Sequence, residues 1–102
     1  QLVFILQRGV RFPQGPPNMP YFVYMILTKQ KDNFTSYVGY TNDLTKRLLL
    51  HNNSRGAKFT KGRKWELIYY KKYSTKSNAM KGEYRLKKDY KLRNLIKANF
   101  LK

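Results

Sequence analysis

FVYMILTKQKDNFTSYVGYTNDLTKRLLLH, at residues 22–51, is the stretch that decides the fold. It opens within a continuous run of aromatic and branched apolar residues, 21–27, which is typical of a strand buried on both faces. The segment 29–35 is polar and turn-forming, and the short run 36–40 predicts a second strand. The two strands are therefore expected to form a hairpin.

A helix is expected after the hairpin. Residues 43–53 place Leu44 and Leu48 on one stripe, as an amphipathic helix does. Asn42 or Asp43 is suited to cap its first turn.

The second half of the chain predicts one more strand and two more helices. The strand is expected at residues 65–73, with Leu67, Tyr69 and Tyr73 on one face. A helix over about 77–90, capped by Ser74, Thr75 or Ser77, is followed by a last helix over 92–101 whose inward residues are Leu92, Leu95, Ile96 and Phe100. The order ββαβαα predicts a small α+β domain, with a three-stranded antiparallel or mixed sheet flanked by helices.

The first 18 residues differ from the rest. The segment RFPQGPPN, residues 11–18, concentrates proline and glycine, which favours an extended or disordered tail. The chain begins with Gln1, and Met19 is a candidate natural start, so residues 1–18 are expected to be disordered or artificial in origin. The domain itself is expected to span residues 19–102.

The charge indicates the class of partner. Lys and Arg number 22 against 5 Asp and Glu, which gives a formal net charge of +17. So high a charge is costly in a compact domain unless a polyanion binds it, and the 16% of aromatic residues include rings that could stack on bases. Nucleic acid is the leading partner, and an anionic membrane surface or a merely soluble, lysine-rich surface is the alternative.

Other compositional features exclude several classes of protein. Cysteine is absent, which rules out disulfides and thiolate metal sites and permits a reducing compartment, so a cytoplasmic protein is expected. No apolar run reaches the roughly 18 residues that a membrane-spanning helix needs. We therefore expect no membrane partner and no small-molecule cofactor, and a monomer or weak dimer.

The predicted hairpin contains two tyrosines and a glycine that are candidate site residues. Tyr24 and Tyr37 share a face of the sheet if residue 24 pairs with residue 37 or with a residue an even step away, such as Gly39. A glycine within a strand often marks the close approach of a ligand or another backbone. We expect a phosphate to approach the main chain at Gly39.

Three further side chains are suited to chemistry on a phosphate. Arg47 and His51, the only histidine, are four residues apart and so share a helix face with Asp43. Arginine offers a phosphate a planar fork of donors, and histidine titrates near neutral pH. Glu83 is expected inside the apolar stripe that Ala79, Leu86 and Tyr90 form on its helix, where a carboxylate is costly unless it is paired or binds a metal.

These residue types fit the hydrolysis of a phosphodiester. Glu83, with water and phosphate oxygens, suits Mg²⁺ or Mn²⁺, which would neutralise charge on the phosphate. Arg47 would stabilise the charge of the transition state, and a deprotonated phenol or His51 would take the proton of the attacking water.

The pattern resembles the GIY-YIG nuclease superfamily, and most closely its small, stand-alone bacterial members. FVY (22–24) and YVG (37–39) occupy the places of the two motifs, although Phe22 and Val23 replace the glycine and isoleucine of the first. RLLLH, GAKFTKGR and AMKGEYRLKK look like later blocks of that subgroup. The resemblance implies the family's fold, metal-dependent DNA cleavage, and a catalytic set of Tyr24, Tyr37, Arg47 and Glu83, with Glu83 as metal ligand and Gly39 shaping the site.

The leading hypothesis is therefore a Mg²⁺-dependent DNA endonuclease, with structure-specific action in repair or recombination as its candidate role. The basic loop SRGAKFTKGRK is expected to bind the nucleic-acid backbone through Arg55, Lys58, Lys61, Arg63 and Lys64. The alternative is a nucleic-acid-binding module without catalysis, in which the tyrosines and Glu83 are structural.

Overall fold

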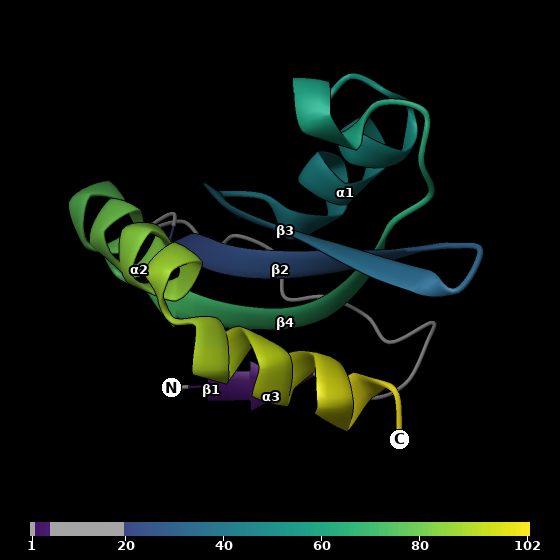
Figure 1. The fold of residues 1–102 in the computed structure, drawn as a ribbon. Helices are drawn as coiled ribbons and strands as arrows, with labels where there is room; N and C mark the ends of the chain where they lie inside the picture. Colours follow the sequence, from purple (N-terminus) through teal and green to yellow (C-terminus); the bar gives the residue numbers. More distant parts are fainter. Residues whose placement is uncertain (1, 5–19) are drawn as a thin grey trace.

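The computed structural model describes residues 2–4 and 20–102. Their elements are, in chain order, β1 (Leu2–Phe4), β2 (Tyr21–Gln30), β3 (Asn33–Thr41), α1 (Leu44–Asn52), the short 3₁₀ helix η1 (Lys58–Thr60), β4 (Glu66–Tyr73), α2 (Lys76–Lys88) and α3 (Tyr90–Phe100). The strands form one antiparallel sheet in the order β1-β4-β2-β3 (Figure 1).

The predicted α+β domain is confirmed, with β2, β3 and β4 as its three expected strands. The sheet also has a fourth strand, because the backbone of Leu2–Phe4 pairs with β4 from Tyr69 to Lys71. These three residues belong to the segment predicted to be a tail, and their backbone pairs with the sheet. The remaining part of that prediction, including RFPQGPPN, lies outside the described residues.

The hairpin is longer than the sequence pattern indicates. Its strands continue through the polar segment 29–35, as far as the pair Gln30 and Asn33. Only Lys31 and Asp32 form the turn, and Lys31 adopts a positive φ of 54°. Polar residues at the exposed end of a hairpin are compatible with strand pairing, because cross-strand hydrogen bonds involve the backbone.

A bulge reverses one face assignment in β4. Met25 pairs with Tyr69 whereas the next residue, Ile26, pairs with Leu67, so Ile68 is the extra residue. Because side chains alternate along a strand, this insertion places Leu67 on the opposite face from Tyr69. The prediction that these two side chains share a face was wrong.

The sheet has a separate apolar cluster on each face. On what we call the α1 face, Leu44 of α1 packs with residues of β2, Trp65 and Leu67; the cluster is Phe22, Tyr24, Ile26, Leu44, Trp65 and Leu67. On the α2/α3 face, the two C-terminal helices pack on the cluster Val23, Met25, Leu27, Val38, Ile68, Tyr69, Ala79, Leu86 and Ile96. Figure 1 shows α2 and α3 crossing in front of the sheet, whereas α1 lies beyond the edge strand β3.

Three polar caps set the helix ends. The side chains of Asp43, Thr75 and Asp89 accept a hydrogen bond from a backbone N–H in the first turn of α1, α2 and α3, respectively. Asp89 also ends α2, which separates Tyr90 from the helix predicted to contain it. Across the described residues, every helix is too short or too polar to cross a membrane.

Two residues that were predicted to be buried are exposed. Tyr90 is 67% exposed and is no part of an apolar stripe on α2, and Leu95 is 55% exposed, not inward. The buried residues of α2 are Ala79, Gly82 and Leu86. A Cβ on Gly82 would lie 2.2 Å from the phenol oxygen of Tyr73, so the glycine lets α2 lie close to β4.

Candidate active site

The two motif tyrosines lie on the same face of the sheet. Tyr24 pairs with Gly39 and Ile26 pairs with Tyr37, so Tyr24 and Tyr37 are an even step apart in the register. Both side chains belong to the α1 face, where Tyr24 is buried and Tyr37 is half-buried. The observed register is thus the one that the prediction required for the two tyrosines to share a face.

A chain of hydrogen bonds links Tyr24 to His51 and Thr60. The Tyr24 hydroxyl lies 2.7 Å from His51 Nε2, and His51 Nδ1 lies 2.9 Å from Thr60 Oγ1. The Thr60 hydroxyl donates to the carbonyl of Ala57 at 2.9 Å, so Thr60 Oγ1 can only accept from His51. This assigns the proton of the neutral imidazole to Nδ1 and makes Nε2 the acceptor of the Tyr24 proton.

Arg47 approaches the same phenol from α1. Its Nε donates to the Tyr24 hydroxyl at 3.3 Å, and this hydrogen bond is the main reason that the pKa of Arg47 is raised. Tyr37 also contributes to that rise, so both phenols act on the guanidinium. Burial raises the pKa of Tyr24 to about 12, with the hydrogen bond and charge of Arg47 acting in the opposite direction.

His51 is enclosed by its partners. It is 0% exposed, and burial, together with the positive charge of Arg47, lowers its pKa to about 4. At neutral pH the imidazole is therefore uncharged. Both of its ring nitrogens have partners, so the predicted direct removal of a proton from water by His51 does not fit this geometry. The imidazole can exchange a proton with Tyr24 instead.

Two glycines make room for these rings. A Cβ on Gly39 would lie 2.5 Å from the Tyr24 hydroxyl oxygen, and one on Gly56 would lie 2.3 Å from His51 Nδ1. The Tyr24 phenol thus occupies the space beside Gly39, and the approach of a phosphate to the main chain there stays a prediction. Gly56 and Thr60 were not predicted as site residues, although both lie in the block GAKFTKGR that carries the family resemblance.

The loop between α1 and β4 is held against the site by Asn52 and Trp65. The Asn52 side chain accepts from the backbone N–H of Trp65 at 2.6 Å and donates to its carbonyl at 3.1 Å. The indole Nε1 donates to the carbonyl of Thr60 at 3.0 Å. These bonds fix the loop that orients His51.

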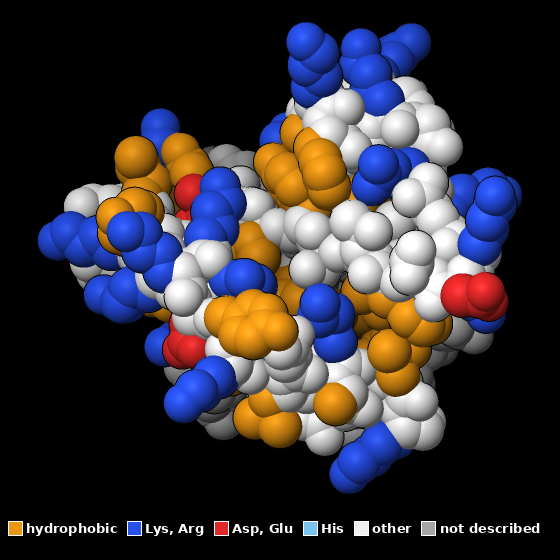
Figure 2. Space-filling view, viewed as in Figure 1, with side chains coloured by type: hydrophobic (Ala, Val, Ile, Leu, Met, Phe, Trp, Pro, Cys, Tyr) orange, Lys and Arg blue, Asp and Glu red, His pale blue; other side chains and the backbone are white. Residues whose placement is uncertain are grey.

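The basic side chains predicted to bind nucleic acid occupy this loop. Arg55, Lys58, Lys61 and Lys64 are exposed. Arg63 instead lies with its guanidinium 4.8 Å from the centre of the Phe59 ring, which in turn stacks on Tyr37 at 6.1 Å. Figure 2 shows Lys and Arg side chains gathered at the top, over α1 and its following loop. Their contact with nucleic acid stays a prediction.

Glu83 lies on α2 and acts on Tyr24 through its charge. Its charge is among the causes that raise the pKa of Tyr24, although a smaller one than burial. Its side chain is 21% exposed and its ion pair with Lys87 is long, at 3.8 Å. Glu83 therefore borders the buried stripe of α2, and its predicted place inside a stripe with Tyr90 was wrong.

Residues 20–97 match the family model described as the GIY-YIG catalytic domain. The chain belongs to the GIY-YIG family. This is a nuclease family, and the match covers all of the elements that surround Tyr24, from β2 into α3. The family resemblance predicted from the motifs is thus confirmed.

Curated bacterial proteins are similar to this GIY-YIG chain. "UPF0213 protein YazA" of Bacillus subtilis is 51% identical over 69 residues, which cover 67% of this chain and 67% of that protein. A UPF0213 protein of Bacillus pumilus is 54% identical over 50% of this chain and 53% of its own length. UPF0213 protein OB0043 of Oceanobacillus iheyensis is 43% identical over 66% of this chain and 76% of its own length. No solved structure matches at a significant level.

Proposed function

We propose that this chain is a metal-dependent endonuclease that hydrolyses phosphodiester bonds in DNA. The observation that carries the proposal is the Tyr24 hydroxyl, which lies 2.7 Å from a neutral imidazole acceptor and 3.3 Å from a guanidinium donor. A phenol with a base behind it and a cation beside it is suited to relay a proton next to a phosphate.

The proton relay follows from the assigned hydrogen bonds. Tyr24 passes its proton to His51 Nε2 and takes one from the attacking water, whose oxygen bonds to phosphorus as the bond to the leaving oxygen breaks. The pKa values of about 12 for Tyr24 and about 4 for His51 keep the resting phenol neutral. Because the charge of Arg47 helps to lower the pKa of His51, a phosphate that pairs with Arg47 would make His51 a stronger base.

Arg47 is the proposed electrostatic group. Its Nε is committed to Tyr24. The outer nitrogens of its fork would donate to a non-bridging oxygen of the phosphate, where charge grows in the transition state. Tyr37 would help to position this fork.

Glu83 is the proposed metal ligand. Within the described residues, no three His, Cys, Asp or Glu side chains form a cluster, and Lys87 is the only ion-pair partner of Glu83. A single, partly exposed carboxylate of this kind fits Mg²⁺ or Mn²⁺, which commonly take one or two carboxylates together with waters and phosphate oxygens. The bound ion would neutralise charge on the phosphate and on the leaving oxygen.

The exposed side chains of Arg55, Lys58, Lys61 and Lys64 would hold the DNA backbone, with Arg63 nearer the site. Such contacts position a nucleic acid without reading its sequence. Preference for a nicked, flapped or branched DNA, as in repair or recombination, would therefore depend on the shape of the substrate. Contact of the backbone near Gly39 with a phosphate remains part of the same proposal.

The experiment is a cleavage panel. Labelled linear, nicked, flapped and branched DNAs, and matching RNAs, are incubated with the protein with and without Mg²⁺ or Mn²⁺, alongside the variant Glu83→Gln. We expect metal-dependent cleavage of DNA, reduced at least about 100-fold in the variant. Cleavage by Glu83→Gln at the parent rate would reject the metal ligand. Tight binding without cleavage of any substrate would favour a binding module.

A further inference from the structure

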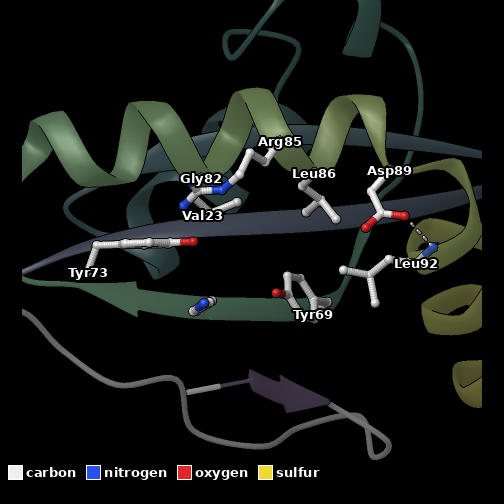
Figure 3. Close-up of a pocket in the computed structure, with 9 residues that line it drawn as sticks. Val23, Tyr69, Tyr73, Gly82, Arg85, Leu86, Asp89 and Leu92 are labelled. Atoms are coloured by element: carbon white, nitrogen blue, oxygen red, sulfur yellow. Dashed lines mark hydrogen bonds between the residues drawn. The ribbon is translucent and has the colours of Figure 1, made fainter.

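A cavity of about 170 Å³ lies on the α2/α3 face, away from the relay on the α1 face. Three alternate residues of β4 form one wall, and the C-terminal half of α2 and the start of α3 form the other; the lining is Val23, Tyr69, Lys71, Tyr73, Gly82, Arg85, Leu86, Asp89 and Leu92. Figure 3 shows the phenol oxygens of Tyr69 and Tyr73 and the guanidinium of Arg85 directed into the same space.

Two cationic side chains and one carboxylate line this cavity. Lys71 and Arg85 have no ion-pair partner within residues 2–4 and 20–102. The one carboxylate, Asp89, has its Oδ1 engaged by the backbone N–H of Leu92 at 3.0 Å, where it caps α3. The lining thus carries two cations against one carboxylate, a net positive charge that favours the binding of an anion.

The uncharged residues of the lining indicate which kind of anion would fit the cavity. The phenol of Tyr73 packs against Gly82, where a Cβ would lie 2.2 Å from its oxygen, so the backbone of α2 limits its position. Val23, Leu86 and Leu92 add an apolar surface to the cations and hydroxyls. A phosphate with a small organic group attached matches this combination, because arginine and lysine bind its oxygens and the apolar wall covers its carbon skeleton.

We propose that this cavity binds a phosphomonoester, either a free mononucleotide or the terminal phosphate of a nucleic-acid strand. The site is separate from the Tyr24 relay, since Val23 lines the cavity whereas its neighbour Tyr24 belongs to the cluster on the opposite face of the sheet. The proposal does not depend on nuclease activity.

Binding is measured without metal, by isothermal titration calorimetry with deoxyadenosine 5′-monophosphate, and with deoxyadenosine as the probe that lacks phosphate. We expect the monophosphate to bind and the nucleoside to bind at least 10-fold more weakly. The double variant Lys71→Gln with Arg85→Gln should weaken binding of the monophosphate at least 10-fold. The charge-matched control, Lys72→Gln with Lys81→Gln, should change it less than 3-fold.

Two results would overturn the proposal. An equal loss in the control would mean that only the overall charge attracts the ligand. A loss in Arg47→Gln that equals the loss in the double variant would place the phosphate at Tyr24. If the double variant does not fold, as judged by circular dichroism, Tyr73→Phe replaces it, with an expected loss of about 3-fold and no loss refuting the site.

The source of the phosphate is tested with short single-stranded DNAs that carry or lack a 5′-phosphate. Tighter binding of the phosphorylated strand, by at least 5-fold and only when Lys71 and Arg85 are present, supports a strand end as the ligand. If the mononucleotide alone shows this dependence, the free nucleotide is the ligand. If neither compound depends on the two cations, the cavity is not a phosphate site.

Discussion

Tyr24 on the α1 face and Tyr69 on the α2/α3 face are both buried phenols with a pKa of about 12, and burial is the main cause for each. They differ in what surrounds the hydroxyl. Tyr24 has a guanidinium donor and an imidazole acceptor, whereas the second influence on Tyr69 is the neighbouring phenol of Tyr73. A raised pKa alone therefore does not identify a phenol suited to catalysis; its hydrogen-bond partners do.

The largest expected effect is on the rate of DNA cleavage, and it distinguishes a phenol that relays a proton from a phenol that only packs. Tyr24→Phe removes the hydroxyl that links Arg47 to His51, and we expect DNA cleavage to fall about 10²–10⁴-fold. Tyr40→Phe makes the same chemical change on β3, where the ring packs toward the α2/α3 face, and should change the rate less than about 3-fold. Single-turnover kinetics at saturating enzyme measures both, and similar losses would contradict the distinction.

The second prediction concerns stability in acid. The pKa of His51 is about 4 in the folded protein against the ordinary histidine value of 6.5, so the unfolded chain binds the extra proton at intermediate pH. The free energy of unfolding should therefore fall as pH drops from about 6.5 to 4, by about 3 kcal/mol from this group.

Urea unfolding at pH 7, 6, 5 and 4 measures this loss. His51→Gln is the comparison, because glutamine does not titrate and the variant keeps every other acid-sensitive group of the parent. The difference in unfolding free energy between parent and variant should shrink as the pH falls. Parallel curves would mean that the imidazole is not buried in its neutral form.

A smaller effect tests how His51 is oriented. Thr60→Val keeps the shape of the side chain and removes the acceptor of the Nδ1 proton, so the neutral imidazole can adopt the wrong tautomer. We expect about a 10-fold loss of cleavage with little change in DNA affinity. Thr60→Ser restores the hydroxyl and should recover most of the rate. A Ser variant as slow as the Val variant would indicate a packing role.

The smallest expected effect concerns the exposed loop. Replacing Lys58, Lys61 and Lys64 by Gln should make the slope of log affinity against log salt less steep by about 2 to 3 units on duplex DNA. Three glutamines at Lys87, Lys88 and Lys91, on α2 and α3, provide the charge-matched control. A salt slope that changes equally in both proteins would show that total charge, and not the loop, sets the affinity.

Much of the α1 face followed from local rules in the sequence. Tyr24 pairs with Gly39, two residues from Tyr37, so the strand register alone decides that the two tyrosines share a face. Helix periodicity predicts that Arg47 and His51 lie on one face of α1. The partner of His51 did not follow, because Thr60 is nine residues away and reaches it only when the loop closes over Gly56.

The wrong predictions occur where one local irregularity in the backbone shifts the periodicity of the side chains along a strand or helix. The bulge at Ile68 moved Leu67 to the other face, and the break at Asp89 separated Tyr90 from α2. The pairing of Leu2 with Lys71 joins distant parts of the chain, which no local pattern indicates. The cavity beside Lys71 depends on the same long-range packing, so it too could be found only in the folded structure.

The enclosure of His51 has a consequence for turnover. An imidazole that is 0% exposed and bonded at both nitrogens offers an accepted proton no direct exit to bulk water. In the proposed reaction the proton would have to return through the Tyr24 oxygen before a second strand could be cut. If the relay operates as proposed, His51 would hold one proton at a time, and its deprotonation through Tyr24 would add a step to every catalytic cycle.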